Sequence, residues 1–164
     1  MSKEYNLVGI KVWTYVIGEG GVEEWDFATE NDFEVLSDIS IRTSKNFSIE
    51  VMYHREGSED IIRKDFVIPK GWTFDGASIP PVFWNIIGKP TNEDFRIPAM
   101  IHDWLYGERF NRELSDEIFE ELLDLDGVSL VHRQLMWMAV RVFGHTFYAS
   151  DTSDFWKKVR EIIT

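Results

Sequence analysis

The feature that most constrains the fold of this chain is a change in hydrophobic period near Pro80. Before Pro80, apolar and polar residues alternate, most clearly in residues 46–54, where Phe47, Ile49 and Val51 fall on one face. After Pro80, the apolar residues recur every three to four positions. Because a period of two predicts strands and a period of 3.6 predicts helices, the sequence indicates an α+β fold with strands first and helices afterwards.

The first 75 residues are expected to form an N-terminal antiparallel β-sheet. Besides residues 46–54, the predicted strands are residues 7–17, 22–27, 33–42 and 61–68. Gly18-Glu19-Gly20-Gly21 is a turn sequence that ends the first of these strands.

The rest of the chain is expected to form a C-terminal cluster of four or five helices. The candidates are residues 81–87, 98 to about 106 or 109, 115–125, 130–143 and 154–163. Ser78, Ser115 and Ser129 suit the N-cap positions of three of them. No repeat or linker interrupts the order, so a single domain is predicted over residues 1–164, mainly strands in 1–75 and mainly helices in 76–164.

The composition excludes several classes of protein. A hydrophobic content of 44% indicates a globular chain, and the absence of cysteine removes disulfides, thiolate metal sites and cysteine nucleophiles. The net charge of -12 repels phosphate backbones, so we expect no direct nucleic-acid binding. A protein partner is compatible with this charge and is expected instead. No apolar run approaches the roughly 20 residues of a transmembrane segment, and the polar start lacks the parts of a signal peptide. We therefore expect no transmembrane segment and no secretion by a signal peptide.

Two short stretches, residues 72–81 and 102–106, concentrate groups that can do chemistry. Their candidate site residues are Trp72, Asp75, Ser78, His102, Asp103, Trp104 and Tyr106. On a helix, His102 and Tyr106 share one face while Asp103 points about 100° away. A general base and a metal ligand could therefore line one pocket from adjacent positions without bonding each other.

These residues also have structural interpretations. His102 suits a half-buried helix residue bonded to a carbonyl, and Asp103 suits a solvated charge. Asp75 before Gly76 suits an Asx turn, in which the carboxylate accepts from its own following backbone. Ser78 is a better helix cap than nucleophile, since no Gly-x-Ser-x-Gly elbow surrounds it.

Asp116 imposes a geometric condition. Near a helix N-terminus its carboxylate is explained by the helix dipole alone. If Asp116 instead orients His102, the second and third helices must form an antiparallel hairpin. His102 lies at least four residues, or roughly 6 Å, back from the end of its helix. The contact therefore requires that helix to end early, near Tyr106 or Gly107.

Four motifs give the chain a family resemblance. In order, they occupy residues 66–80, 102–106, 115–119 and 136–144. Together they closely resemble the phage and prophage family catalogued as domain of unknown function 1353, over roughly half of the chain. Gly76 departs from the family, which usually has a larger residue there. The resemblance implies a phage or prophage origin, with the protein in the host cytoplasm during infection or in the virion, and it implies no activity.

A second resemblance bears on activity. His102-Asp103 followed by Tyr106, with a later Asp116, is similar to the active-site helices of secreted calcium-dependent phospholipases. It implies that His102 activates a water, Asp116 orients the imidazole and Asp103 holds Ca²⁺ or another divalent cation, with Asp75 as a further oxygen ligand. The glycine-rich calcium loop and flanking cysteines of those enzymes are missing. The implied activity is that of a His/Asp-dependent, metal-assisted ester hydrolase.

The alternative is a non-catalytic phage protein that binds a host or virion protein partner. The acidic composition and seven tryptophans suit protein contacts, because aromatic residues are enriched in interface cores. Trp104 and Trp137 also suit core positions on amphipathic helices. A hydrolase predicts that His102, Asp103, Asp116 and Asp75 converge, whereas a binder predicts that they bond the backbone locally.

Overall fold

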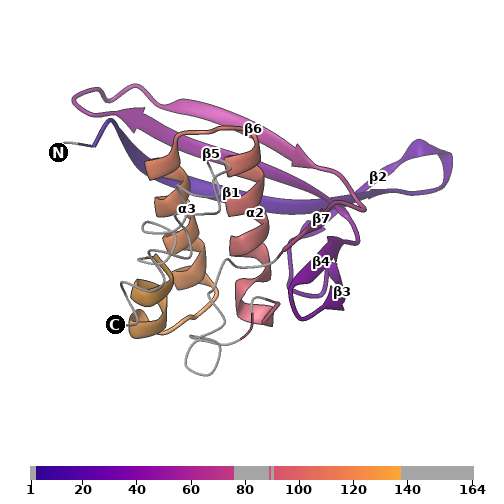
Figure 1. Cartoon of the computed structure of the whole chain (residues 1–164). Coiled ribbons are helices and arrows are strands. Elements are labelled where there is room, and N and C mark those ends of the chain that lie inside the picture. Colours follow the sequence, from indigo (N-terminus) through magenta and orange to yellow (C-terminus); the bar gives the residue numbers. More distant parts are fainter. Residues whose placement is uncertain (1–2, 76–88, 90, 138–164) are drawn as a thin grey trace. The chain divides into compact units, whose positions relative to one another are not determined.

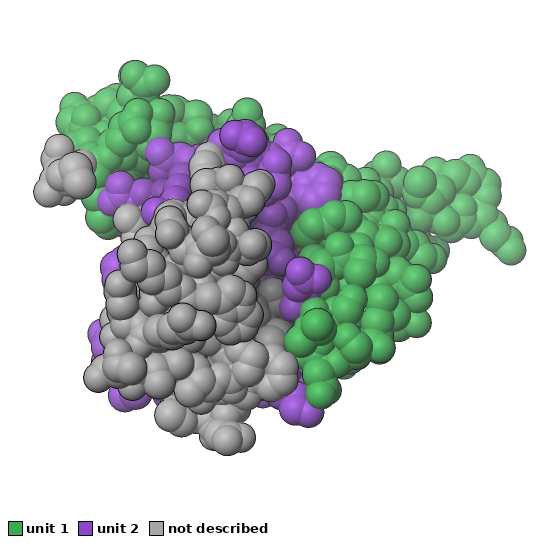
Figure 2. Space-filling model, viewed as in Figure 1, with its two compact units in different colours: residues 1–74 green, residues 75–164 purple. Residues whose placement is uncertain are grey.

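The structure is a computed structural model that describes residues 3–75, 89 and 91–137. The chain divides into two compact units, residues 1–74 and 75–164, which Figure 2 shows in green and purple. In the described residues the first unit contains the strands and the second the helices, so the predicted α+β class is confirmed. The prediction of a single domain stays a prediction.

The first unit contains a four-stranded antiparallel sheet with the strand order β2-β1-β5-β6 (Figure 1). Its strands are β1 (Tyr5–Ile17), β2 (Glu23–Phe27), β5 (Asn46–Arg55) and β6 (Ile62–Ile68). A 3-10 turn, η1 (Glu19–Gly21), joins β1 to β2, and Gly20 and Gly21 there have φ of 75° and 77°, a region that favours glycine. The structure confirms these four strands, which lie close to their predicted ranges.

A second, three-stranded sheet corrects the prediction of one sheet. Its order is β3-β4-β7, and its strands are β3 (Phe33–Ser37), β4 (Ser40–Thr43) and β7 (Thr73–Phe74). The prediction of one strand over residues 33–42 was wrong, because the chain reverses at Asp38 and Ile39 and pairs Phe33 with Thr43. Alternation does not reveal so short a turn when an apolar residue occupies it: Ile39 lies in the turn and is exposed.

The core of the first unit follows the alternation of β5. Phe47, Ile49 and Val51 are buried, as predicted, while their neighbours in the strand are half-buried. Phe47 lies opposite Ile68 of β6, and Phe33 of β3 stacks on Phe47 with ring centroids 5.2 Å apart. Both sheets therefore contribute to one apolar core.

The described part of the second unit contains three helices rather than four or five. They are α2 (Arg96–Gly107), preceded by the 3-10 turn η3 (Glu93–Phe95), then α3 (Arg112–Leu125) and helical residues 130–137. The candidates at 81–87 and 154–163 lie outside the described residues, as does the candidate at 130–143 beyond residue 137. Ser129 accepts from the backbone N–H of His132 at 3.3 Å, as its predicted cap role requires.

The α2–α3 hairpin depends on where α2 ends. It ends at Gly107, as the predicted contact with Asp116 required. Arg109 then takes a left-handed φ of 54°, and the Phe110 N–H donates to the Leu105 carbonyl at 2.9 Å. This bond occupies one of the carbonyls left open at a helix end, so the chain can reverse after a short connection.

The start of α3 corrects a predicted cap. Asn111, not Ser115, is the N-cap: its side chain accepts from the Leu114 N–H at 2.9 Å. Ser115 lies inside the helix, fully buried, and its hydroxyl donates to the Asn111 carbonyl at 2.8 Å. Asp116 was predicted in the first turn of this helix. Because α3 starts at Arg112, Asp116 instead occupies the fifth helical position.

The helices bury an apolar stripe on each side of the hairpin. The buried apolar residues are Ile97, Ala99, Met100, Ile101 and Leu105 on α2, and Leu114, Ile118, Phe119, Leu122 and Leu123 on α3. Trp104 is only half-buried and Trp137 is 40% exposed, so the prediction of two buried tryptophans was wrong. In the described residues no helix has the length and apolar character needed to span a bilayer.

Candidate functional site

The second unit holds a buried histidine–aspartate pair across the α2–α3 hairpin. His102 Nε2 lies 2.8 Å from Asp116 Oδ1. Both side chains are withdrawn from solvent: His102 is 4% exposed and Asp116 is 0% exposed. Asp116 therefore lies within bonding distance of His102, and the pair is bonded across the hairpin rather than to the backbone.

Tyr106 joins the pair through the same carboxylate oxygen. Its hydroxyl donates to Asp116 Oδ1, and its ring lies 4.1 Å from the His102 ring, measured between centroids. Burial raises the pKa of Tyr106 far above its usual value, and the negative charge of Asp116 and the bond to it raise it further. Tyr106 is therefore a permanent donor to Asp116 at physiological pH.

The carboxylate determines which nitrogen of His102 carries the proton. An ionised carboxylate only accepts, so Nε2 must donate to Asp116. In a neutral imidazole Nδ1 then keeps its lone pair. Among the described residues no hydrogen bond reaches Nδ1. The pair can thus act as a general base through Nδ1.

Asp103 and Asp75 form a second acidic feature of this unit. Asp103 is half-buried on α2, and burial raises the pKa of its carboxyl well above the usual value, with the negative charge of Asp75 as the next cause. Asp75 itself is exposed. A cation beside Asp103 would be favoured by the negative charges of both carboxylates. The described residues contain no group of three or more histidine, aspartate or glutamate side chains placed to hold a metal ion.

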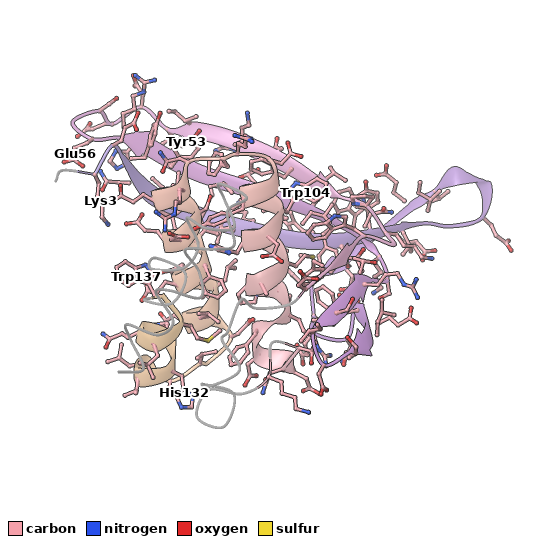
Figure 3. The ribbon with its side chains drawn as sticks, viewed as in Figure 1. Lys3, Tyr53, Glu56, Trp104, His132 and Trp137 are labelled. Atoms are coloured by element: carbon pink, nitrogen blue, oxygen red, sulfur yellow. The ribbon has the colours of Figure 1, made fainter. Side chains whose placement is uncertain are left out.

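The remaining predicted pocket residues lie in different units or outside the described residues. Trp72 belongs to the first unit, where it stacks on Phe74 with centroids 5.2 Å apart. Trp104 lies on α2 (Figure 3). Ser78 is outside the described residues. A pocket shared by Ser78, Trp72, Trp104 and Tyr106 stays a prediction.

Two residues of the cluster were not among the predicted site residues. The Phe119 ring lies 4.9 Å from the His102 ring, measured between centroids. Arg112, through a hydrogen bond and its positive charge, partly offsets the rise in the pKa of Tyr106 that burial and Asp116 cause. Sequence spacing held a signal for both. Arg112 precedes Asp116 by four residues and Phe119 follows it by three, so all three share one face of α3.

The fold and this cluster define an α+β protein with a buried His–Asp pair, joined by the half-buried Tyr106, on a helix hairpin. The chain belongs to the family described as "Protein of unknown function (DUF1353)", whose match covers residues 35–140, more than half of the chain. It is also 33% identical over 72 residues to the uncharacterized protein y4iH of Sinorhizobium fredii (strain NBRC 101917 / NGR234). That match covers 43% of this chain and 30% of the relative, so the chain matches less than a third of the relative's length. No solved structure matches the chain.

Proposed function

We propose that the chain is a His/Asp-dependent hydrolase of esters, in which His102 activates a water for attack on the substrate carbonyl. One observation carries the proposal: the 2.8 Å bond between His102 Nε2 and Asp116 Oδ1, which leaves Nδ1 as the base. Taken singly, His102, Asp103 and Asp75 each also fit a structural role in a helix or turn. An imidazole oriented by a buried carboxylate, however, is an arrangement that general-base catalysis uses.

In the proposed reaction, Nδ1 takes one proton from water while the water oxygen forms a bond to the carbonyl carbon. Asp116 stabilises the resulting imidazolium through its bond to Nε2, and the imidazolium then returns the proton to the leaving alkoxide as the carbon–oxygen ester bond breaks. The products are a carboxylic acid and an alcohol, and His102 returns to its neutral form. Tyr106, which donates to Asp116, is a positioning residue.

Asp103 and Asp75 are the residues that would hold a divalent cation. The fit rests on their electrostatics: burial and then the negative charge of Asp75 raise the pKa of Asp103, so a positive charge there would stabilise the ionised carboxylates. Two carboxylates supply only part of the six to eight oxygen ligands that Ca²⁺ takes, and water and carbonyl oxygens commonly supply the rest. A bound cation would polarise the ester carbonyl and stabilise the negative charge that develops on its oxygen.

The decisive experiment measures hydrolysis of p-nitrophenyl butyrate and of phosphatidylcholine vesicles, each with Ca²⁺, Mg²⁺ or Mn²⁺. His102→Gln is expected to lower the rate by about 10²–10⁴-fold, the usual contribution of a general base. His54→Gln is the matched control, because His54 lies on β5 in the first unit and, among the described residues, the hydrogen bond of its ring is to the Arg55 carbonyl of its own strand. The control variant should keep the wild-type rate.

The role of the cation has its own readout. Calorimetric titration with Ca²⁺ should show binding to the wild type and weaker binding to Asp103→Asn, while Asp103→Asn should still show the native near-ultraviolet circular dichroism. A wild-type protein that hydrolyses neither substrate with any of the three cations would refute the hydrolase. Hydrolysis that His102→Gln does not reduce would refute the assigned base.

A further inference from the structure

The first unit exposes two aromatic residues on one short strand. All five residues of β2 are exposed, with Trp25 at 52% and Phe27 at 77%. Scattered exposed apolar residues need no explanation, whereas a contiguous aromatic group marks an interaction surface. The exposed aromatic residues of β2 therefore indicate a surface that binds a partner.

Strand register places these residues on one face of the sheet. Trp25 lies opposite Tyr15 of β1, and Phe27 lies opposite Trp13. Since alternate residues of a strand share a face, Trp13, Tyr15, Trp25 and Phe27 all point the same way. We call these four residues the aromatic patch. It is continuous across the β1–β2 pair.

Two contacts hold the Trp25 ring of the aromatic patch in place. Trp25 stacks on Tyr15, with centroids 4.7 Å apart and 26° between the rings. Its indole Nε1 donates to Glu23 at 3.0 Å. The ring is therefore held in place before any partner arrives, which lowers the entropy cost of binding. The Glu23 carboxylate thus lies at the edge of the indole, so a cation over the ring would be attracted by both the ring and a nearby negative charge.

β2 also offers backbone groups for pairing. It is an edge strand of the four-stranded sheet, and in Figure 1 the β1–β2 hairpin extends past the ends of β5 and β6. The Phe27 N–H donates to the Asp26 side chain at 2.8 Å rather than to β1. Because backbone groups alternate in direction along an antiparallel strand, those of Trp25 and Glu23 also face away from β1. An extended segment could add to this edge as a fifth strand.

Charge selects the partner. β2 carries Glu23, Glu24 and Asp26 and no basic residue. A second copy would place these carboxylates against each other and bring together two chains of net charge -12. Phosphate backbones are repelled for the same reason. We propose that the β2 edge binds an extended protein segment that carries lysine or arginine, with its backbone paired to β2 and a cationic side chain over Trp25.

The test uses a synthetic octapeptide of alternating lysine and threonine, titrated into the whole chain by calorimetry. Trp25→Ser and Asp26→Lys should each weaken binding by at least about tenfold. Asp65→Lys and Val67→Ser are the matched controls, since both residues are exposed on β6, the opposite edge strand of the same sheet. These variants should bind as the wild type does. Hydrogen exchange of the Trp25 amide should slow in the complex, which contact by side chains alone would not produce.

Several outcomes would overturn the proposal. They are failure of the wild type to bind the basic peptide, equal binding of the peptide with glutamate in place of lysine, and equal losses from β2 and β6 variants. Sedimentation is a separate arm: a dimer that Trp25→Ser dissociates would assign the edge to a second copy and refute a basic partner. Neither arm depends on the hydrolase, because His102→Gln should leave peptide binding unchanged.

Discussion

At the scale of single residues, the site depends on two side chains one helical turn apart that bond the same atom. His102 and Tyr106 lie four residues apart on α2, and both donate to Oδ1 of Asp116. The sequence could predict that they share a face, because helical spacing requires it. It could not predict that Asp116 lies level with them, because that depends on where both helices end.

Tyr106 allows a test of this cluster by pH. Its pKa is raised by burial and by Asp116, so the folded protein keeps the phenol protonated where an unfolded chain ionises it, near pH 10. The stability from Tyr106 is therefore fully present below about pH 10 and is lost as the pH rises above it. Absorbance at 295 nm should show a phenolate of Tyr106 that appears only on unfolding, and Tyr106→Phe should remove that contribution. A phenolate of Tyr106 titrating near pH 10 in the folded protein would contradict the buried bond.

At the scale of elements, helix boundaries decide the site. α3 starts at Arg112, so Asp116 lies four residues, about 6 Å, along it, while His102 lies five residues, about 7.5 Å, before Gly107. These similar depths bring the pair together, whereas a start at Ser115 would have left Asp116 at the helix end. The sequence alone was ambiguous, because Asn111 and Ser115 are both good caps one turn apart and periodicity does not choose between them.

The Asn111 cap gives the prediction at this scale. Asn111→Ala removes the acceptor of the Leu114 N–H and should lower the free energy of unfolding by about 1 kcal/mol. Asn111→Asp keeps an acceptor there and should cost much less. Urea unfolding followed by circular dichroism measures both. Equal losses in the two variants would contradict the cap, because only the alanine variant lacks the oxygen.

At the scale of the whole molecule, patterning predicted the class but not the number of sheets. The change in hydrophobic period distinguished strands from helices, because burial of one face gives apolar residues a period of two in a strand and about 3.6 in a helix. The split into two sheets was missed because it depends on a two-residue reversal at Asp38 and Ile39, which leaves the alternation of residues 33–42 nearly intact. Net charge is a second global property, and it is set by 29 acidic against 17 basic residues.

This charge predicts how salt affects stability. Self-repulsion among the excess carboxylates opposes the compact state, and raising the salt from about 0.01 M to about 0.1 M shortens the Debye length from about 30 Å to about 10 Å. We expect stability to rise by about 1 kcal/mol, or about 2–4 °C in melting temperature by calorimetry. A triple variant, Glu24→Gln, Glu59→Gln and Asp65→Asn, neutralises exposed acids and should show a smaller rise. A melting temperature that falls with salt would mean that ion pairs such as Arg133 with Asp124, 2.7 Å apart, outweigh the repulsion.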